Sequence, residues 1–303
     1  MAMPAQSDQP PNAIALLDRA GDGAVRRFID VGGGALAYAD IGAGDTVVVL
    51  IHGALTVLDD MLLALEAHLA GFRVIAFDRP GFGKSARRSV GDAGIFRQAD
   101  GLNQALDELG VEQAVLVGHS FGGAVATAMA MARPKRAIGV VALATLAVPE
   151  LRLDHILFGP RGLPLGGGAV AGLSHGGVDR ALLPALWRAM FLPQSMPETM
   201  SSRFPFALAG EAGATSRVGE DCLASGPDLL AILAMAPLLE TPLQILGGAA
   251  DLVINNHWHG RVLAALAPHG QFSLLPGVGH MIHHAEPARV RLAINDVLAA
   301  ARR

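Results

Sequence analysis

The chain has 303 residues, of which 51% are hydrophobic and 17% charged, enough to bury one large α/β domain or a core domain with an insertion. A formal net charge of −4 gives no electrostatic footprint for nucleic acid and no basic patch for anionic membranes. Cys222 is the only cysteine, which excludes an intrachain disulfide framework and favours a reducing, cytoplasmic location.

The start of the chain carries no recognisable targeting segment. Residues 1–22 lack a basic stretch followed by an apolar one, so we expect a flexible N-terminal tail. The most apolar run, at 137–148, is too short to cross a bilayer and predicts a buried strand. We therefore expect no membrane span.

The first half of the chain predicts a sheet with helices on both faces. Alternating stretches at 25–31 and 35–41, on either side of a glycine turn, indicate an antiparallel hairpin. Strands and helices then alternate, as is typical of parallel βαβ units. The expected strands are 46–51, 72–77, 113–118 and 137–144, and the expected helices are 58–70, 97–110 and 121–132.

This alternation is interrupted after the sixth strand. The interruption is rich in Gly and Pro and contains short amphipathic stretches broken by proline. Strands are expected again at 242–248 and 271–277, and helices at 257–267 and 287–301. We expect a tail at 1–22, a core at 23–146 and 239–303, and a cap insertion at 147–238.

A serine stands between the strand at 113–118 and the following helix, in the sequence Gly118-His119-Ser120-Phe121-Gly122. A turn this sharp strains the serine backbone and requires small residues two before and two after it, which the glycines supply. The hydroxyl is then lifted clear of the sheet, and the Phe121 N–H faces developing negative charge. The motif alone also fits a glycine-rich turn with an incidental serine.

Two further stretches follow strands at the same edge. His52-Gly53-Ala54 ends the strand at 46–51, and the Ala54 N–H is a second candidate donor to an oxyanion. We expect His52 to bond to the loop backbone, with no role in proton transfer. In the stretch after the strand at 72–77, Asp78 and Arg79 are expected to fix their loop through local hydrogen bonds.

Asp251 and His280 each come just beyond a predicted strand. Because the carboxyl ends of parallel strands converge, we expect both side chains to lie near Ser120. His269 precedes its strand and is expected to face the opposite edge. Two other acids, Asp154 and Asp228, belong to the insertion and are weaker candidates than Asp251.

In their order and placement, these stretches resemble serine-type α/β-hydrolases with a helical cap, from about residue 25 to the C-terminus. The resemblance implies the α/β-hydrolase fold, a mostly parallel twisted sheet flanked by helices with an inserted helical cap. It implies Ser120 as nucleophile, His280 as general base and then acid, and Asp251 as the residue that orients the imidazole. It also implies an oxyanion hole formed by the backbone N–H groups of Ala54 and Phe121, and no cofactor.

The reaction we expect is hydrolysis of a small or medium apolar carboxylic ester or lactone through an acyl-enzyme. A serine nucleophile argues against haloalkane dehalogenases and epoxide hydrolases, which use aspartate. C–C bond hydrolases of ring-cleavage products stay open, although they typically carry Trp where Met281 stands. Three further functions stay open: a proline-iminopeptidase-like amidase using acidic cap residues (Glu150, Glu198 or Glu211), perhydrolysis as a side activity, and a catalytically weak ligand receptor.

The expected pocket takes residues from the core and from the apolar cap, and the expected partner is one small apolar molecule. We expect no nucleic-acid partner and a monomer or homodimer. The residues expected to line the pocket are His52, Leu55, His119, Trp187, Met190, Phe191 and Met281.

The chain holds eleven histidines, but their spacing does not match a metal-binding motif. His257 and His259 are expected on the surface or in contact with the cap, at the start of a helix. His283 and His284 are expected on the loop before the last helix. We therefore expect no metal site.

Overall fold

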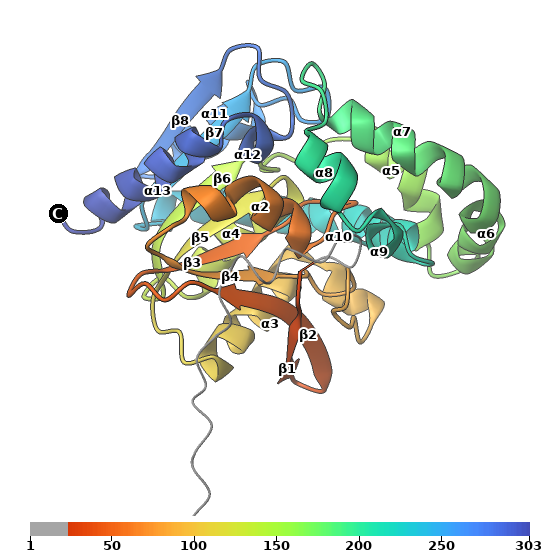
Figure 1. The fold of residues 1–303 in the computed structure, drawn as a ribbon, viewed down its shortest axis with the longest axis horizontal. Coiled ribbons are helices and arrows are strands. Elements are labelled where there is room, and N and C mark those ends of the chain that lie inside the picture. Colours follow the sequence, from red (N-terminus) through yellow and green to blue (C-terminus); the bar gives the residue numbers. More distant parts are fainter. Residues whose placement is uncertain (1–23) are drawn as a thin grey trace, which may run out of the picture.

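The computed structural model describes residues 24–303, except the side chains at 175 and 176; the tail expected at 1–22 lies outside the described residues. Eight strands form one twisted sheet in the order β1-β2-β4-β3-β5-β6-β7-β8 (Figure 1). β1 and β2 form the expected antiparallel hairpin, β2 pairs antiparallel with β4, and all later pairs are parallel. The strands are Arg27–Val31, Gly34–Ile41, Val47–Ile51, Arg73–Phe77, Ala114–His119, Ala137–Leu143, Leu243–Gly248 and Gly270–Leu275.

The central strands form where runs of β-branched and aliphatic residues can be buried on both faces. Every residue of β3 is buried, and Val49 lies between Ile75 of β4 and Leu116 of β5. A strand buried on both faces needs no polar alternation, which is why the sequence shows continuous apolar runs there.

Helices cover both faces of the sheet, and a separate apolar cluster packs against each face. One face is covered by α3 (Ile95–Glu108), α4 (Phe121–Ala132) and α11 (His259–Leu266). The other is covered by α2 (Leu58–Leu65), α12 (Ile282–Ala285) and α13 (Pro287–Ala300). Two short 3-10 turns, Glu66–His68 and Val90–Ala93, complete this part, and the first of them takes up the end of the helix expected at 58–70. The α/β-hydrolase architecture expected from the sequence is confirmed.

The segment between β6 and β7 is helical, and α5, α6 and α7 project from one side of the sheet (Figure 1). Its elements are α5 (Leu153–Phe158), η3 (Gly159–Gly162), α6 (Gly167–Ser174), η4 (His175–Asp179), α7 (Arg180–Met190), α8 (Glu198–Arg203), α9 (Phe206–Ala209), α10 (Ala214–Met235) and η5 (Ala236–Leu238). A third apolar cluster joins this helical segment, residues 147–238, which we call the cap region, to the core. The Trp187 indole N–H also donates to the Leu55 carbonyl at 2.8 Å.

The long helix α10 differs from the short helices expected in this region. It continues through Pro227, which has no N–H to donate and would by itself disfavour a helix interior. α10 packs on α5, η3 and α3 and buries Val218, Cys222 and Leu229. Tertiary contacts of this kind stabilise a helix that its local sequence would interrupt.

Among the described residues, one helical segment has the length and composition needed to cross a bilayer. It is Ala214–Leu238, which comprises α10 and η5, and a third of its most apolar window is buried inside the protein. The helix of a folded core passes the same test, so this finding by itself is weak evidence for a span.

Candidate active site

Ser120 occupies the turn between β5 and α4 with the backbone angles φ 55° and ψ −119°. A positive φ is strained for a serine and is characteristic of functional turns. The flanking glycines allow the turn because a Cβ on Gly118 would overlap the Gly122 carbonyl, and a Cβ on Gly122 would overlap the carbonyls of Ile51 and His52. These overlaps explain why the motif needs glycine at both positions.

His280 follows β8, and its Nδ1 lies 2.8 Å from Asp251 Oδ2. The Asp251 carboxylate is held in turn by the backbone N–H groups of Val253 and Ile254, at 2.7 and 3.0 Å, and by the Asn256 amide at 2.7 Å. Three donors besides the imidazole therefore fix the orientation of this carboxylate. Asn256 was not anticipated from the sequence, although it stands only five positions after Asp251.

The charge state of Asp251 follows from these contacts. Burial acts to raise the pKa of the carboxyl group, but the charge and hydrogen bond of His280, together with the two backbone N–H groups, outweigh it. The pKa of Asp251 is lowered, so the carboxylate remains ionised at neutral pH. An ionised carboxylate accepts the imidazole Nδ1–H and leaves Nε2 to accept a proton.

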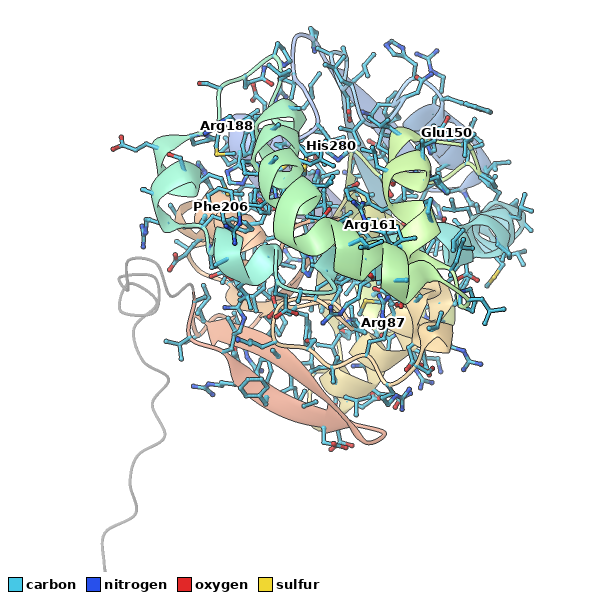
Figure 2. The ribbon with its side chains drawn as sticks, turned by 90° about the vertical axis from the view of Figure 1, so that its right-hand side faces the viewer. Arg87, Glu150, Arg161, Arg188, Phe206 and His280 are labelled. Atoms are coloured by element: carbon cyan, nitrogen blue, oxygen red, sulfur yellow. The ribbon has the colours of Figure 1, made fainter. Side chains whose placement is uncertain are left out.

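Ser120, Asp251 and His280 line one cavity of about 450 Å³, which also includes Ala54 and Phe121. His280 lies behind the cap helices when the molecule is viewed from the side on which the cap projects (Figure 2). No hydrogen bond between the Ser120 hydroxyl and His280 occurs among the described contacts. Such bonds commonly form only around a bound substrate.

The expected pocket residues divide into two groups. Leu55 and Met190 line the cavity, whereas His52, His119, Trp187, Phe191 and Met281 are buried and are not among the residues that line it. Trp187, Phe191 and Met281 belong to the apolar cluster that joins cap and core. Their size and hydrophobicity suit the packing of the cap as well as they suit a pocket, and the sequence does not separate these two uses.

The two histidines of the second group have backbone partners. His52 Nε2 accepts the Arg79 N–H at 2.9 Å, and its Nδ1 lies 2.8 Å from the Gly53 carbonyl. His119 donates from Nε2 to the His280 carbonyl at 3.1 Å. His52 therefore bonds to the loop backbone, as expected, and His119 positions the residue that follows β8.

Arg79 is fully buried beneath the loop that carries Ala54. Its guanidinium donates to the carbonyls of His52 and Gly53, at 3.0 and 3.2 Å, and to the Asp221 carboxylate of α10 at 2.8 Å. The local role expected for Arg79 is thus extended by an ion pair to the cap. Sequence reasoning missed Asp221, because 142 residues separate the two partners.

A second link joins the core to the entry of the cap. His259 is buried at the start of α11, and its Nδ1 accepts the backbone N–H groups of Ala147 and Val148 at 3.0 and 3.1 Å. The Nε2 atom lies 2.7 Å from Glu150, which lines the cavity. His259 is therefore in contact with the cap entry, which is one of the two placements expected from the sequence.

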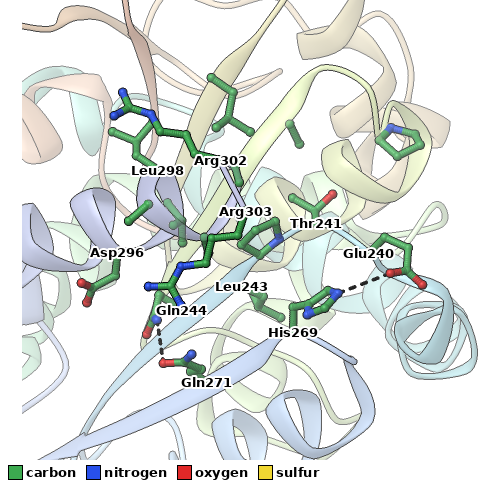
Figure 3. A pocket seen from close by; sticks show the side chains of 18 of the residues that line it. Glu240, Thr241, Leu243, Gln244, His269, Gln271, Asp296, Leu298, Arg302 and Arg303 are labelled. Atoms are coloured by element: carbon green, nitrogen blue, oxygen red, sulfur yellow. Dashed lines mark hydrogen bonds and ion pairs between the residues drawn. The ribbon is translucent and has the colours of Figure 1, made fainter.

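A larger hollow of about 1240 Å³ lies at the opposite edge of the sheet (Figure 3). Its lining includes Ala137, Leu243 and Gly270, each the first residue of a strand, and an exposed ion pair between His269 and Glu240 at 3.4 Å. His269 thus faces away from Ser120, as expected. The smaller cavity is the candidate site because the reactive side chains line it.

Two clusters among the described residues have the atom types of a metal site. In one, Asp60 Oδ1 lies 2.8 Å from His284 Nε2 and 3.1 Å from His283 Nε2. Both histidines lie on α12, with His283 buried and His284 half-buried, and not on a loop as expected.

The other metal-type cluster contains Asp154, His155 and Cys222. Burial raises the pKa of the Cys222 thiol, so the thiol stays protonated. The Asp154 carboxylate pairs with the Arg152 guanidinium at 3.0 Å. A protonated thiol beside a guanidinium is a poor cation ligand.

The family model for the alpha/beta hydrolase fold matches residues 46–287. Curated relatives include the dihydrolipoyllysine-residue acetyltransferase component of the acetoin cleaving system of Cupriavidus necator, 38% identical over 39% of this chain and 31% of the relative. Another is the 2-hydroxy-6-oxononadienedioate/2-hydroxy-6-oxononatrienedioate hydrolase of Paraburkholderia phymatum, 39% identical over 33% of this chain and 36% of the relative. The matches thus span about a third of the length of these relatives.

Among solved structures, the enol-lactonase from Burkholderia xenovorans LB400 has a TM-score of 0.70 and 22% identity over 90% of this chain and 100% of that chain. This likeness supports the fold alone. The family match extends from β3 to the start of α13 and includes Ser120, Asp251 and His280. The chain belongs to the α/β-hydrolase family.

Proposed function

We propose that this protein is a serine hydrolase that cleaves a small or medium apolar carboxylic ester or lactone through an acyl-enzyme on Ser120. The observation that carries the proposal is the strained Ser120 turn, which shares a cavity with the hydrogen-bonded pair of His280 and Asp251. We further propose that residues 147–238 form a cap over this cavity.

In the proposed reaction the Ser120 hydroxyl attacks the substrate carbonyl while His280 Nε2 takes its proton. Asp251 holds the Nδ1–H and stabilises the imidazolium that forms. The N–H groups of Ala54 and Phe121 donate to the oxyanion; Phe121 is the first residue of α4, where a helix has unpaired N–H groups. His280 returns the proton to the leaving alkoxide, and water activated by His280 then releases the acid.

The walls of the cavity support an apolar substrate. The apolar lining comes from the loop after β6 and from the cap, and includes Leu146, Leu157, Phe158, Leu186 and Met190. Flexible Met and flat aromatic side chains adapt to ligands of differing shape. A volume of about 450 Å³ fits a small or medium ester.

The test is turnover of a panel of p-nitrophenyl esters and lactones. Ser120→Ala is expected to lower the hydrolytic rate by on the order of 10⁴-fold, because the reacting groups act as a unit. Wild-type turnover retained by Ser120→Ala, in a preparation free of host esterases, would refute the assignment. A wild-type protein that binds esters without turnover or burst would instead be a receptor.

One observation favours C–C bond hydrolysis as a second candidate. Arg152 lines the cavity, its side chain is 5% exposed, and its Nη1 has no hydrogen-bond partner among the described residues. A buried guanidinium of this kind suits a substrate that carries a carboxylate. The similar protein from Paraburkholderia phymatum is named for hydrolysis of a dicarboxylate, which fits this chemistry. Faster cleavage of a carboxylate-bearing ring-cleavage product than of any neutral ester would favour this candidate.

A further inference from the structure

The outer part of the cap has an unusual surface. Between residues 151 and 178, every exposed residue whose side chain is described is Leu, Ile, Val, Ala, Gly or Pro. The polar residues described in this stretch are buried or half-buried: Arg152, Asp154, His155, Arg161 and Ser174. We call the exposed Leu151, Leu153, Ile156, Leu165 and Leu173 the apolar cap face.

These side chains stand far out into solvent. Leu165 is 91% exposed, Leu173 87% and Leu151 79%. Apart from the buried Ser174 at its end, α6, which carries Leu173, consists of Gly, Ala, Val and Leu, a composition that ordinarily belongs to a buried helix. With eight residues it is about 12 Å long, too short to cross a bilayer but long enough to lie along its surface. α5 and α6 both pack on η3, and α6 lies at the outer end of the cap (Figure 1).

The apolar cap face is continuous with the candidate active site. Leu151 and Leu153 are exposed and also line the cavity that contains Ser120. Leu252 and Val253, on the loop after β7, are likewise exposed and line the same cavity. An apolar molecule that leaves a hydrocarbon phase at this face therefore reaches the cavity along apolar side chains.

The chemistry of the face fits lipid better than a second copy of the chain. Protein interfaces carry about one hydrogen bond per 100–200 Å² and are enriched in aromatic residues and Arg. The described exposed residues of 151–178 include no aromatic residue, no Arg and no hydrogen-bonding side chain. The net charge of −4 opposes binding to anionic lipid, so a bilayer surface without net charge is the one that fits this face.

We propose that the apolar cap face docks on the surface of a zwitterionic bilayer, with the mouth of the cavity turned toward the lipid. Docking needs only the apolar cap face, whose exposed area becomes buried in lipid, and it does not depend on the chemistry of Ser120. It is peripheral and requires no segment that spans the membrane.

The experiment is flotation of the full-length protein with phosphatidylcholine vesicles. Wild-type protein is expected to float, and Leu165→Glu/Leu173→Glu to lower the partition coefficient by about tenfold or more, because both side chains leave the hydrocarbon and gain charge. Leu238→Glu is the matched control: Leu238 is 78% exposed but lies before β7, outside the cap face, and its variant is expected to float like wild type. If the double Glu variant unfolds by circular dichroism, the uncharged Leu165→Ser/Leu173→Ser replaces it, with a smaller loss expected.

Ser120→Ala is expected to float like wild type, which separates docking from the proposed reaction. Three results would overturn the proposal. The first is a wild-type protein that stays unbound, and the second is binding that appears only with phosphatidylglycerol in the vesicles. The third is a lipid-free dimer that the double Glu variant dissociates, since a second copy would then cover the face.

Discussion

His52 and His119 lie fully buried behind the Ser120 turn, and each must stay neutral there. Burial, with the nearby Arg79 charge, holds the pKa of His52 well below that of free histidine. Burial, with the charges of His283 and His280, does the same to the pKa of His119. Both side chains bond to backbone groups around Ser120, so their neutral forms support the shape of the site.

The lowered pKa values of these two histidines predict a pH-dependent stability. Below about pH 6.5 the unfolded chain binds protons at both residues and the native chain does not. Their stabilising contribution is therefore complete above about pH 6.5 and is lost as the pH falls from there toward the folded pKa values. The free energy of unfolding should fall by up to about 1.4 kcal/mol per pH unit for each histidine.

Urea unfolding at a series of pH values between about 7.5 and 5 measures this slope. His119→Asn keeps a side-chain donor and removes one titrating group, so its slope should be shallower than that of wild type. An identical slope in the variant would mean that His119 does not contribute to the pH dependence.

The glycines of the Ser120 turn predict a second effect at single residues. Gly122→Ala should lower the free energy of unfolding by about 2–3 kcal/mol, because its Cβ has no space beside the Ile51 and His52 carbonyls. Gly101→Ala, inside α3 with nothing within 4 Å of the added Cβ, is the control and should raise it by about 0.5–1 kcal/mol. Equal effects in chemical denaturation would contradict the steric reason for the glycine.

At the scale of elements, Asp221 joins α10 of the cap to the core. Its carboxylate contacts both Arg79 and Arg87, at 2.8 and 2.5 Å, and all three side chains are 5% exposed or less. Asp221→Asn leaves two buried guanidinium groups without this charge and should cost about 3 kcal/mol of unfolding free energy. Glu211→Gln, which removes one partner of the more exposed pair with Arg217 at 3.0 Å, should change it by less than about 1 kcal/mol. Similar losses in both variants would show that the buried pair is not the link we describe.

The elements of the sheet could be predicted because their signals are local. The apolar run of β3, the glycines beside Ser120 and the positions of Asp251 and His280 just beyond β7 and β8 all stand in short stretches of sequence. α10 was missed because Pro227 argues locally against a helix that tertiary contacts stabilise. Asp221 and the contact of His259 with Glu150 were missed because their partners are more than 100 residues away.

The pocket was only partly predictable for a related reason. Leu55 and Met190 line the cavity, while Trp187 and Phe191, from the same helical region as Met190, pack inward against the core. Hydrophobicity marks all of these cap residues alike. Which of them faces the cavity depends on how each helix is rotated about its axis when it packs, and the local hydrophobic pattern does not reveal that rotation.

For the molecule as a whole, the two edges of the sheet have different roles. The carboxyl edge brings Ser120, Asp251 and His280 to one cavity, and the amino edge carries the hollow beside His269. The buried ion pair between Arg79 and Asp221 and a shared apolar cluster join the cap region to the core. The apolar cap face adjoins the cavity through the exposed Leu151 and Leu153. The proposed function depends on Ser120 being the activated nucleophile of this edge.

Labelling with a fluorophosphonate, followed by peptide mass spectrometry, tests that claim most directly. We predict a single adduct on Ser120 that forms in the folded protein and is lost or strongly slowed in His280→Ala. A folded protein in which Ser120 stays unlabelled, or in which His280→Ala labels as fast as wild type, would contradict the account.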